Sequence, residues 1–95
     1  SRQEAQRMSI NVVVSFEAED FDKFRAGFDT GRNARAEAGL TVEPFKNIDS
    51  PNNVWVIGTA PSREAFLAFF SDPATQERMR NAGVISPPTI TLLES

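Results

Sequence analysis

The sequence predicts an α+β fold in which strands and helices follow the order β-α-β-β-α-β. Apolar residues alternate with a period of two in four segments, and they recur at helical spacing in the two regions between those segments. Gly, Pro, Asn and Asp mark the points where one segment gives way to the next. This order is the ferredoxin-like arrangement, with both helical regions on one face of a four-stranded antiparallel sheet.

Composition limits the chemistry that the chain can perform. The 95 residues include eight Phe, enough for the core of one small domain. A net charge of −3 without a basic stripe, and the lack of a long apolar run, argue against nucleic acid and membrane as partners. The chain has no Cys, His or Tyr, so thiolate and imidazole chemistry are excluded. We therefore expect no metal and no cofactor and, without a secretion signal, a cytoplasmic location.

The first residues, SRQEAQR, are polar and lack periodicity. We expect residues 1–7 to be a disordered extension or a remnant of protein expression, and residues 8–95 to form a single ferredoxin-like domain. A native extension that begins a helix is the alternative, because EAQR has the propensity for it.

The first half of the domain predicts a strand and an interrupted helix. The strand is Ile10–Phe16, INVVVSF, and Asp20 is the expected N-cap of the helix. The helix carries an aromatic stripe of Phe21, Phe24 and Phe28. Because Thr30-Gly31 weakens the pattern, we expect either one helix with a defect near Gly31 or a break followed by a short helix that ends at Gly39.

The middle of the chain predicts an antiparallel hairpin. Leu40–Asn47 alternates weakly and contains Pro44, which cannot donate a ladder hydrogen bond, so this strand belongs at an edge of the sheet or carries a bulge. The turn IDSPNN follows, and Asn53–Thr59 is the third strand, which we expect to pair with the first at the centre of the sheet.

The second half repeats the helix and strand pattern. Ser62 is the expected N-cap of a helix with the sequence REAFLAFFSD. Asp72 and Pro73 match an N-cap and first-turn residue of a further helix, and Gly83 matches its end. Thr89–Leu93 is the last strand.

The third strand is apolar on both of its faces, since Val54 and Val56 point one way and Trp55 and Ile57 the other. On the first strand, we expect the set Ile10, Val12, Val14 and Phe16 to face the helices; which face Trp55 takes stays open. Because a second apolar face is rare in a monomer, we expect an identical sheet to cover it around a two-fold axis. The expected residues of this dimer interface and core are Val13, Trp55, Ile57 and Leu93. A bound apolar ligand is the alternative cover.

Five pieces of the chain resemble the dimeric α+β barrel superfamily: EDFDKFRAGFD, RAEAGL, DSPNNVWVIG, SREAFLAFFSDP and MRNAGVISPPTITLLE. Within it, the chain is similar to antibiotic-biosynthesis-monooxygenase-like proteins and to small cyclase-like bacterial proteins. The resemblance implies a homodimer packed sheet to sheet, with ligands bound between helices and sheet. The superfamily includes oxygenases, isomerases and haem enzymes, so the resemblance does not decide the activity. The lack of His argues against haem degradation.

Three residues of the central strands are candidate ligand contacts. Asn11 and Ser15 share one face of the first strand, where they are either polar groups in a pocket or a hydrogen-bonded pair at the dimer seam. Trp55 either walls a flat ligand or fills the core between subunits.

A second candidate group lies in GRNAR, where the first helix weakens. Arg32, Asn33 and Arg35 either bind a carboxylate or phosphate at the mouth of a cavity or form a solvated surface. No catalytic residue is assigned.

We expect a homodimeric α+β barrel that binds a small apolar or aromatic metabolite. One alternative is a cofactor-independent monooxygenase or cyclase that acts on a polyketide-like ring, and another is a non-catalytic dimerisation or regulatory module. A cavity between helices and sheet with Asn, Ser, Arg or Trp on its wall favours the first two hypotheses. A space filled by the eight Phe favours the third.

Overall fold

The computed structural model describes residues 9–95, so the expectation for residues 1–7 lies outside the described part of the chain. Its elements are β1 (Ile10–Glu17), α2 (Phe21–Asp29), α3 (Arg32–Glu37), β2 (Thr41–Lys46), β3 (Asn53–Ala60), α4 (Arg63–Ser71), α5 (Pro73–Asn81) and β4 (Thr89–Leu93). The predicted order of strands and helices is confirmed, with both helical regions split.

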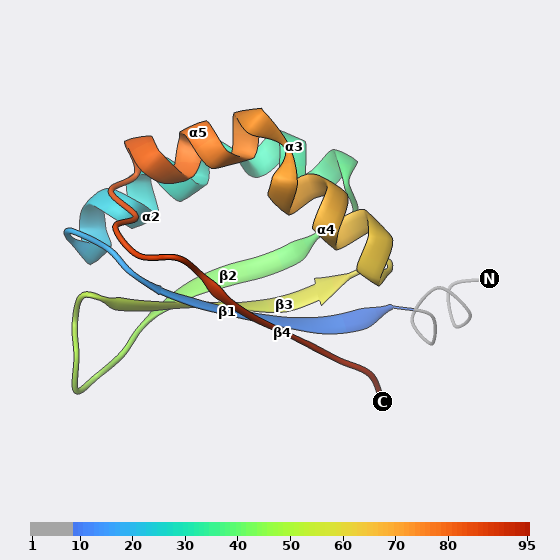
Figure 1. The fold of residues 1–95 in the computed structure, drawn as a ribbon, viewed down its shortest axis with the longest axis horizontal. Coiled ribbons are helices and arrows are strands. Elements are labelled where there is room, and N and C mark those ends of the chain that lie inside the picture. Colours follow the sequence, from blue (N-terminus) through green and yellow to red (C-terminus); the bar gives the residue numbers. More distant parts are fainter. Residues whose placement is uncertain (1–8) are drawn as a thin grey trace.

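The protein has two layers, a four-stranded sheet and a cover of helices on one of its faces (Figure 1). The strand order is β2-β3-β1-β4 and every neighbouring pair is antiparallel. β1 and β3 are therefore the central pair, as predicted. β2 is an edge strand, which explains how it accommodates Pro44.

Three predicted N-caps are confirmed by side chains that accept a hydrogen bond from the first turn of a helix: Asp20 from Lys23 N at 2.9 Å, Ser62 from Ala65 N at 3.1 Å, and Asp72 from Ala74 N at 2.8 Å. Gly39 and Gly83 follow α3 and α5 with φ values of 76° and 86°. This left-handed conformation is the one that favours Gly after a helix.

The first helical region breaks at Thr30 and Gly31, so the second of the two alternatives is correct. The last turn of α2 is closed by local bonds, since Thr30 Oγ1 donates to the carbonyl of Gly27 at 2.6 Å and Gly31 N donates to that of Phe28 at 3.1 Å. The Phe28 carbonyl also accepts a bond from Arg35 Nη1 at 2.6 Å. These bonds hold the chain in a turn before α3 begins at Arg32.

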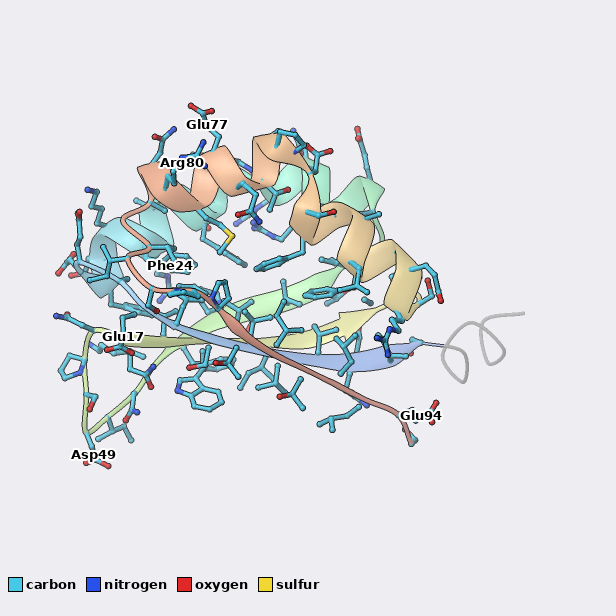
Figure 2. The ribbon with its side chains drawn as sticks, viewed as in Figure 1. Glu17, Phe24, Asp49, Glu77, Arg80 and Glu94 are labelled. Atoms are coloured by element: carbon cyan, nitrogen blue, oxygen red, sulfur yellow. The ribbon has the colours of Figure 1, made fainter. Side chains whose placement is uncertain are left out.

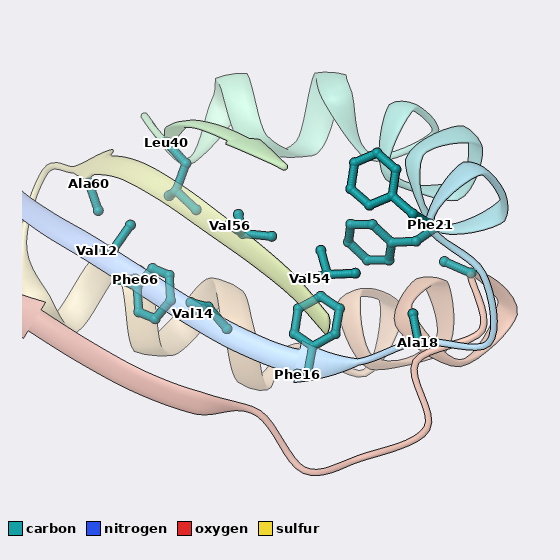
Figure 3. Close-up of a cluster of buried hydrophobic side chains, with 12 residues drawn as sticks. Val12, Val14, Phe16, Ala18, Phe21, Leu40, Val54, Val56, Ala60 and Phe66 are labelled. Carbon is teal, nitrogen blue, oxygen red and sulfur yellow. The ribbon is translucent and has the colours of Figure 1, made fainter. Parts of the chain in front are cut away.

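The core lies between the sheet and the helices (Figure 3). Val12, Val14 and Phe16 of β1 point into it, as predicted, and so do Val54 and Val56 of β3. The helices contribute Phe21, Phe24 and Phe66. Trp55 therefore lies on the opposite face of the sheet, which settles the face that the sequence left open.

Candidate functional site

A cavity of about 90 Å³ lies between the helices and the sheet. Its wall is mainly apolar and includes Val14, Phe28, Val56, Phe66, Phe70 and Met79. The polar residues on the wall are Arg35, Thr75 and Arg78. An apolar cavity of about 150 Å³ is enough to bind benzene, so this one has room for a short aliphatic chain or part of a ring.

Arg35 extends from α3 to the cavity and is held there by Phe28. Its guanidinium carbon lies 3.6 Å from the centroid of the Phe28 ring, and its Nη1 donates to the Phe28 carbonyl at 2.6 Å. Partial burial lowers the pKa of Arg35, Asp29 raises it, and Arg32 and Arg78 lower it further. An arginine keeps its charge under such shifts, so the cavity wall carries a positive group.

Arg78 reaches the same cavity from α5. Its Nη2 donates to Thr75 Oγ1 at 3.1 Å, and Thr75 is only 7% exposed. A Cβ at Gly31 would lie 3.0 Å from both Arg35 Nη1 and Arg78 Nε. The two guanidinium groups thus both pack close to Gly31, and a side chain at that position would crowd them.

An outer groove of about 500 Å³ adjoins the cavity. Its wall includes Ala34 and Glu37 of α3, Ala65 and Ala68 of α4, and Asp72 between α4 and α5. Phe69, Thr75 and Arg78 border both the groove and the cavity. These three residues therefore separate the apolar interior from the open surface.

In the described part of the chain, residues 9–95, no helix lies over the opposite face of the sheet (Figure 1). Its outward residues form a grid of three rows across the four strands: Phe45, Trp55, Ser15 and Thr89; Glu43, Ile57, Val13 and Thr91; Thr41, Thr59, Asn11 and Leu93. We call this grid the open face. Its larger apolar side chains are partly exposed, at 38% for Trp55, 42% for Ile57, 47% for Phe45 and 50% for Leu93.

Asn53 joins two of the predicted site residues on the open face. Trp55 Nε1 donates to Asn53 Oδ1 at 2.7 Å, and Asn53 Nδ2 donates to Ser15 Oγ at 3.2 Å. Asn53 Nδ2 also donates to Glu17 Oε2 at 2.7 Å. Asn11 lies in the row of the grid farthest from this network. Sequence reasoning missed Asn53, because two of its partners, Ser15 and Glu17, lie on β1 and only the register of β1 and β3 reveals them.

The structure brings only Arg35 of the GRNAR group to the cavity. Arg32 and Asn33 are exposed on α3, and Arg32 Nη2 lies 3.9 Å from Asp29 Oδ1. Asn11, Ser15 and Trp55 lie on the other side of the sheet from the cavity. Sequence reasoning missed Arg78 and Thr75, since nothing in the pattern of α5 shows which of its polar residues turn inward.

Within residues 9–95, no three His, Cys, Asp or Glu side chains gather as metal ligands would. No helix in that range is both long and apolar enough to span a membrane. The predicted cytoplasmic location stays a prediction.

Comparison with known proteins identifies the fold. No family model matches the chain, and no curated protein matches it. The fold is that of antibiotic biosynthesis monooxygenase-like proteins. Among solved structures, a candidate antibiotic biosynthesis monooxygenase from Bordetella bronchiseptica superposes with a TM-score of 0.76 at 17% identity, over 92% of this chain and 96% of that one. The resemblance predicted from the sequence is therefore confirmed for the fold.

Two further solved structures have the same fold. SnoaB, a cofactor-independent oxygenase from Streptomyces nogalater, superposes with a TM-score of 0.71 at 16% identity, over 92% of each chain. A conserved protein from Methanosarcina mazei Go1 superposes with a TM-score of 0.74 at 9% identity, over 97% of each chain. Identities this low extend the likeness to the backbone and not to the site.

Proposed function

We propose that this protein is a homodimeric α+β barrel that binds a small apolar or aromatic metabolite in the cavity between its helices and its sheet. The observation that carries the proposal is the cavity itself, an apolar space of about 90 Å³ that opens beside two guanidinium groups. A pocket with an apolar wall and a few convergent polar groups is the usual form of a small-molecule site.

The size of the cavity limits the ligand. A short aliphatic chain fits within about 90 Å³, and a whole ring requires Phe28 or Phe70 on the wall to move. Larger parts of a ligand would extend into the outer groove, which is about 500 Å³ in volume.

The open face supports the dimer in this proposal. Strand spacing gives the grid an area on the order of 400 Å². A stable interface buries about 800 Å² on each partner, so the contact must extend beyond the grid. The loop between β2 and β3 bends toward this side of the sheet, where Asp49 lies (Figure 2). The adjacent Ile48 is 93% exposed, and we assign it to the same interface.

A ligand screen by thermal shift tests the cavity, with benzene, toluene and hexanol as probes. A ligand that binds only the folded state raises the melting temperature. Val56→Phe places a ring in the cavity and should abolish the shift. Ile57→Phe is the matched control, because the neighbouring residue points to the open face and its replacement should leave the shift intact. Equal shifts in both variants, or no shift with any probe in the unaltered protein, would contradict the proposal.

The cofactor-independent oxygenase is the second candidate, and the fold shared with SnoaB favours it. Two observations rank it lower. Asn11 and Trp55, which the sequence predicts as candidate ligand contacts, do not border the cavity, and a multi-ring substrate exceeds the cavity volume. The non-catalytic module ranks third, because the Phe side chains leave a cavity instead of filling the space.

A further inference from the structure

Two arginines, Arg35 and Arg78, border the cavity in a chain whose acids outnumber its bases by 13 to 10. Within residues 9–95, neither Arg35 nor Arg78 forms an ion pair with a carboxylate. Asp29 raises the pKa of Arg35 through its negative charge, but the ion pair of Asp29 is with Arg32, whose Nη2 lies 3.9 Å from Asp29 Oδ1. The two like charges repel each other in a partly dry place, and a bound anion would relieve this repulsion.

The hydrogen bonds of the two guanidinium groups fix their positions and leave donors free. Arg35 uses Nη1 on the Phe28 carbonyl, and Arg78 uses Nη2 on Thr75 Oγ1. A guanidinium has five N–H groups, and the others of this pair have no partner among the described residues. A carboxylate or phosphate matches such forked donors.

The position of the two arginines gives the charged end and the apolar end of a ligand different places to bind. Arg78 and Thr75 border both the apolar cavity and the outer groove, so the charge of Arg78 lies where the two meet, and Arg35 lies on the cavity side. Arg35 Nη1 and Arg78 Nε both approach Gly31, where a Cβ would lie 3.0 Å from each of them. The acidic residues Glu37 and Asp72 line the groove farther out, which confines the positive charge to the mouth of the cavity.

We propose that the ligand is a small amphipathic acid, whose anionic head group binds between Arg35 and Arg78 while its apolar tail enters the cavity. This inference rests on the proposed function, since it names the class of ligand for the same cavity. The head group and the tail are recognised separately, by charge-assisted hydrogen bonds and by an apolar wall.

Binding of hexanoate, hexyl phosphate and hexanol at neutral pH tests the proposal by calorimetric titration. The three probes share a tail and differ in the head group. At least one of the two anions should bind about tenfold more tightly than hexanol, and the stronger of them identifies the head group. Arg78→Gln should reduce this preference and leave hexanol affinity unchanged. Arg80→Gln removes the same charge from an exposed position on α5 and is the matched control.

Arg35→Gln should also reduce the preference for the anion over hexanol. If the loss of the contact between Arg35 and Phe28 unfolds that variant, Arg78→Gln still tests the proposal. Added salt should weaken the binding of the anion and not that of hexanol. If all three probes bind with equal affinity and Val56→Phe abolishes their binding, the anionic head group is overturned and the proposed function stands. If no probe binds, both proposals fail. A preference for the anion that is no weaker in Arg78→Gln than in Arg80→Gln would also overturn the anionic head group.

Discussion

The two faces of the sheet use similar apolar residues and meet different surroundings. Val12 and Val14 of β1 are buried under the helices, whereas Val13 between them lies on the open face. On β3, Val54 and Val56 are buried, and Trp55 and Ile57 remain partly exposed. The covered face completes its burial when the chain folds. The open face mixes its apolar residues with Thr, Ser and Asn, and within residues 9–95 its larger apolar side chains stay partly exposed.

The largest expected effect separates folding from association. Phe66→Ala removes a ring that is 3% exposed under the helices and should lower the free energy of unfolding by about 3–5 kcal/mol. Phe45→Ala removes the same ring from the open face and should cost about 1 kcal/mol or less in the monomer. Urea denaturation at low protein concentration measures both values. Equal losses would show that the two faces do not differ as described.

The second effect concerns assembly. Ile57→Lys places a charge on each of two facing sheets, so it should convert a particle of twice 10.5 kDa into one of 10.5 kDa. Sedimentation velocity at micromolar concentration measures the mass. Leu67→Lys is the control, because Leu67 is comparably exposed but lies on α4, and the variant should keep the mass of the unaltered protein. An unaltered protein of 10.5 kDa would remove the dimer from the proposal.

The smallest effect tests the polar network of the open face. Asn53→Ala removes the bonds of its side chain to Trp55, Ser15 and Glu17 and should lower the free energy of unfolding by about 1–2 kcal/mol. Asn52→Ala changes an exposed neighbour and should have little effect. Thermal unfolding with tryptophan fluorescence reports both stability and the surroundings of Trp55. A cost for Asn53→Ala no larger than for Asn52→Ala would show that the network contributes nothing.

The ends of helices were predictable because they depend on neighbours in the chain. Asp20, Ser62 and Asp72 each cap the turn that follows them, and Gly39 and Gly83 each end a helix, as their local sequences indicate. The break at Gly31 was predictable only as one of two alternatives. Its outcome involves a bond from Arg35 to the Phe28 carbonyl, which local propensity does not specify.

The candidate site was only partly predictable, because its residues come together through contacts that local sequence does not specify. Arg35 was included in a group of three polar residues, but the sequence did not separate it from Arg32 and Asn33, which face solvent. Arg78 joins Arg35 from the other half of the chain. No spacing rule links residues on two helices that meet only after folding.

The sequence by itself determined the periods of the strands and helices, the caps and turns, and the presence of two apolar faces on the central strands. These features follow from backbone geometry and from contacts within a few residues. The tertiary structure alone decided which face of β3 the helices cover and where the cavity lies. The covered face and the position of the cavity both depend on how closely distant segments can approach each other. At Gly27, for example, an added Cβ would lie 2.5 Å from Ala82 Cβ and would hold α2 away from the end of α5. Such approach distances are set by packing between segments and not by the order of residues within them.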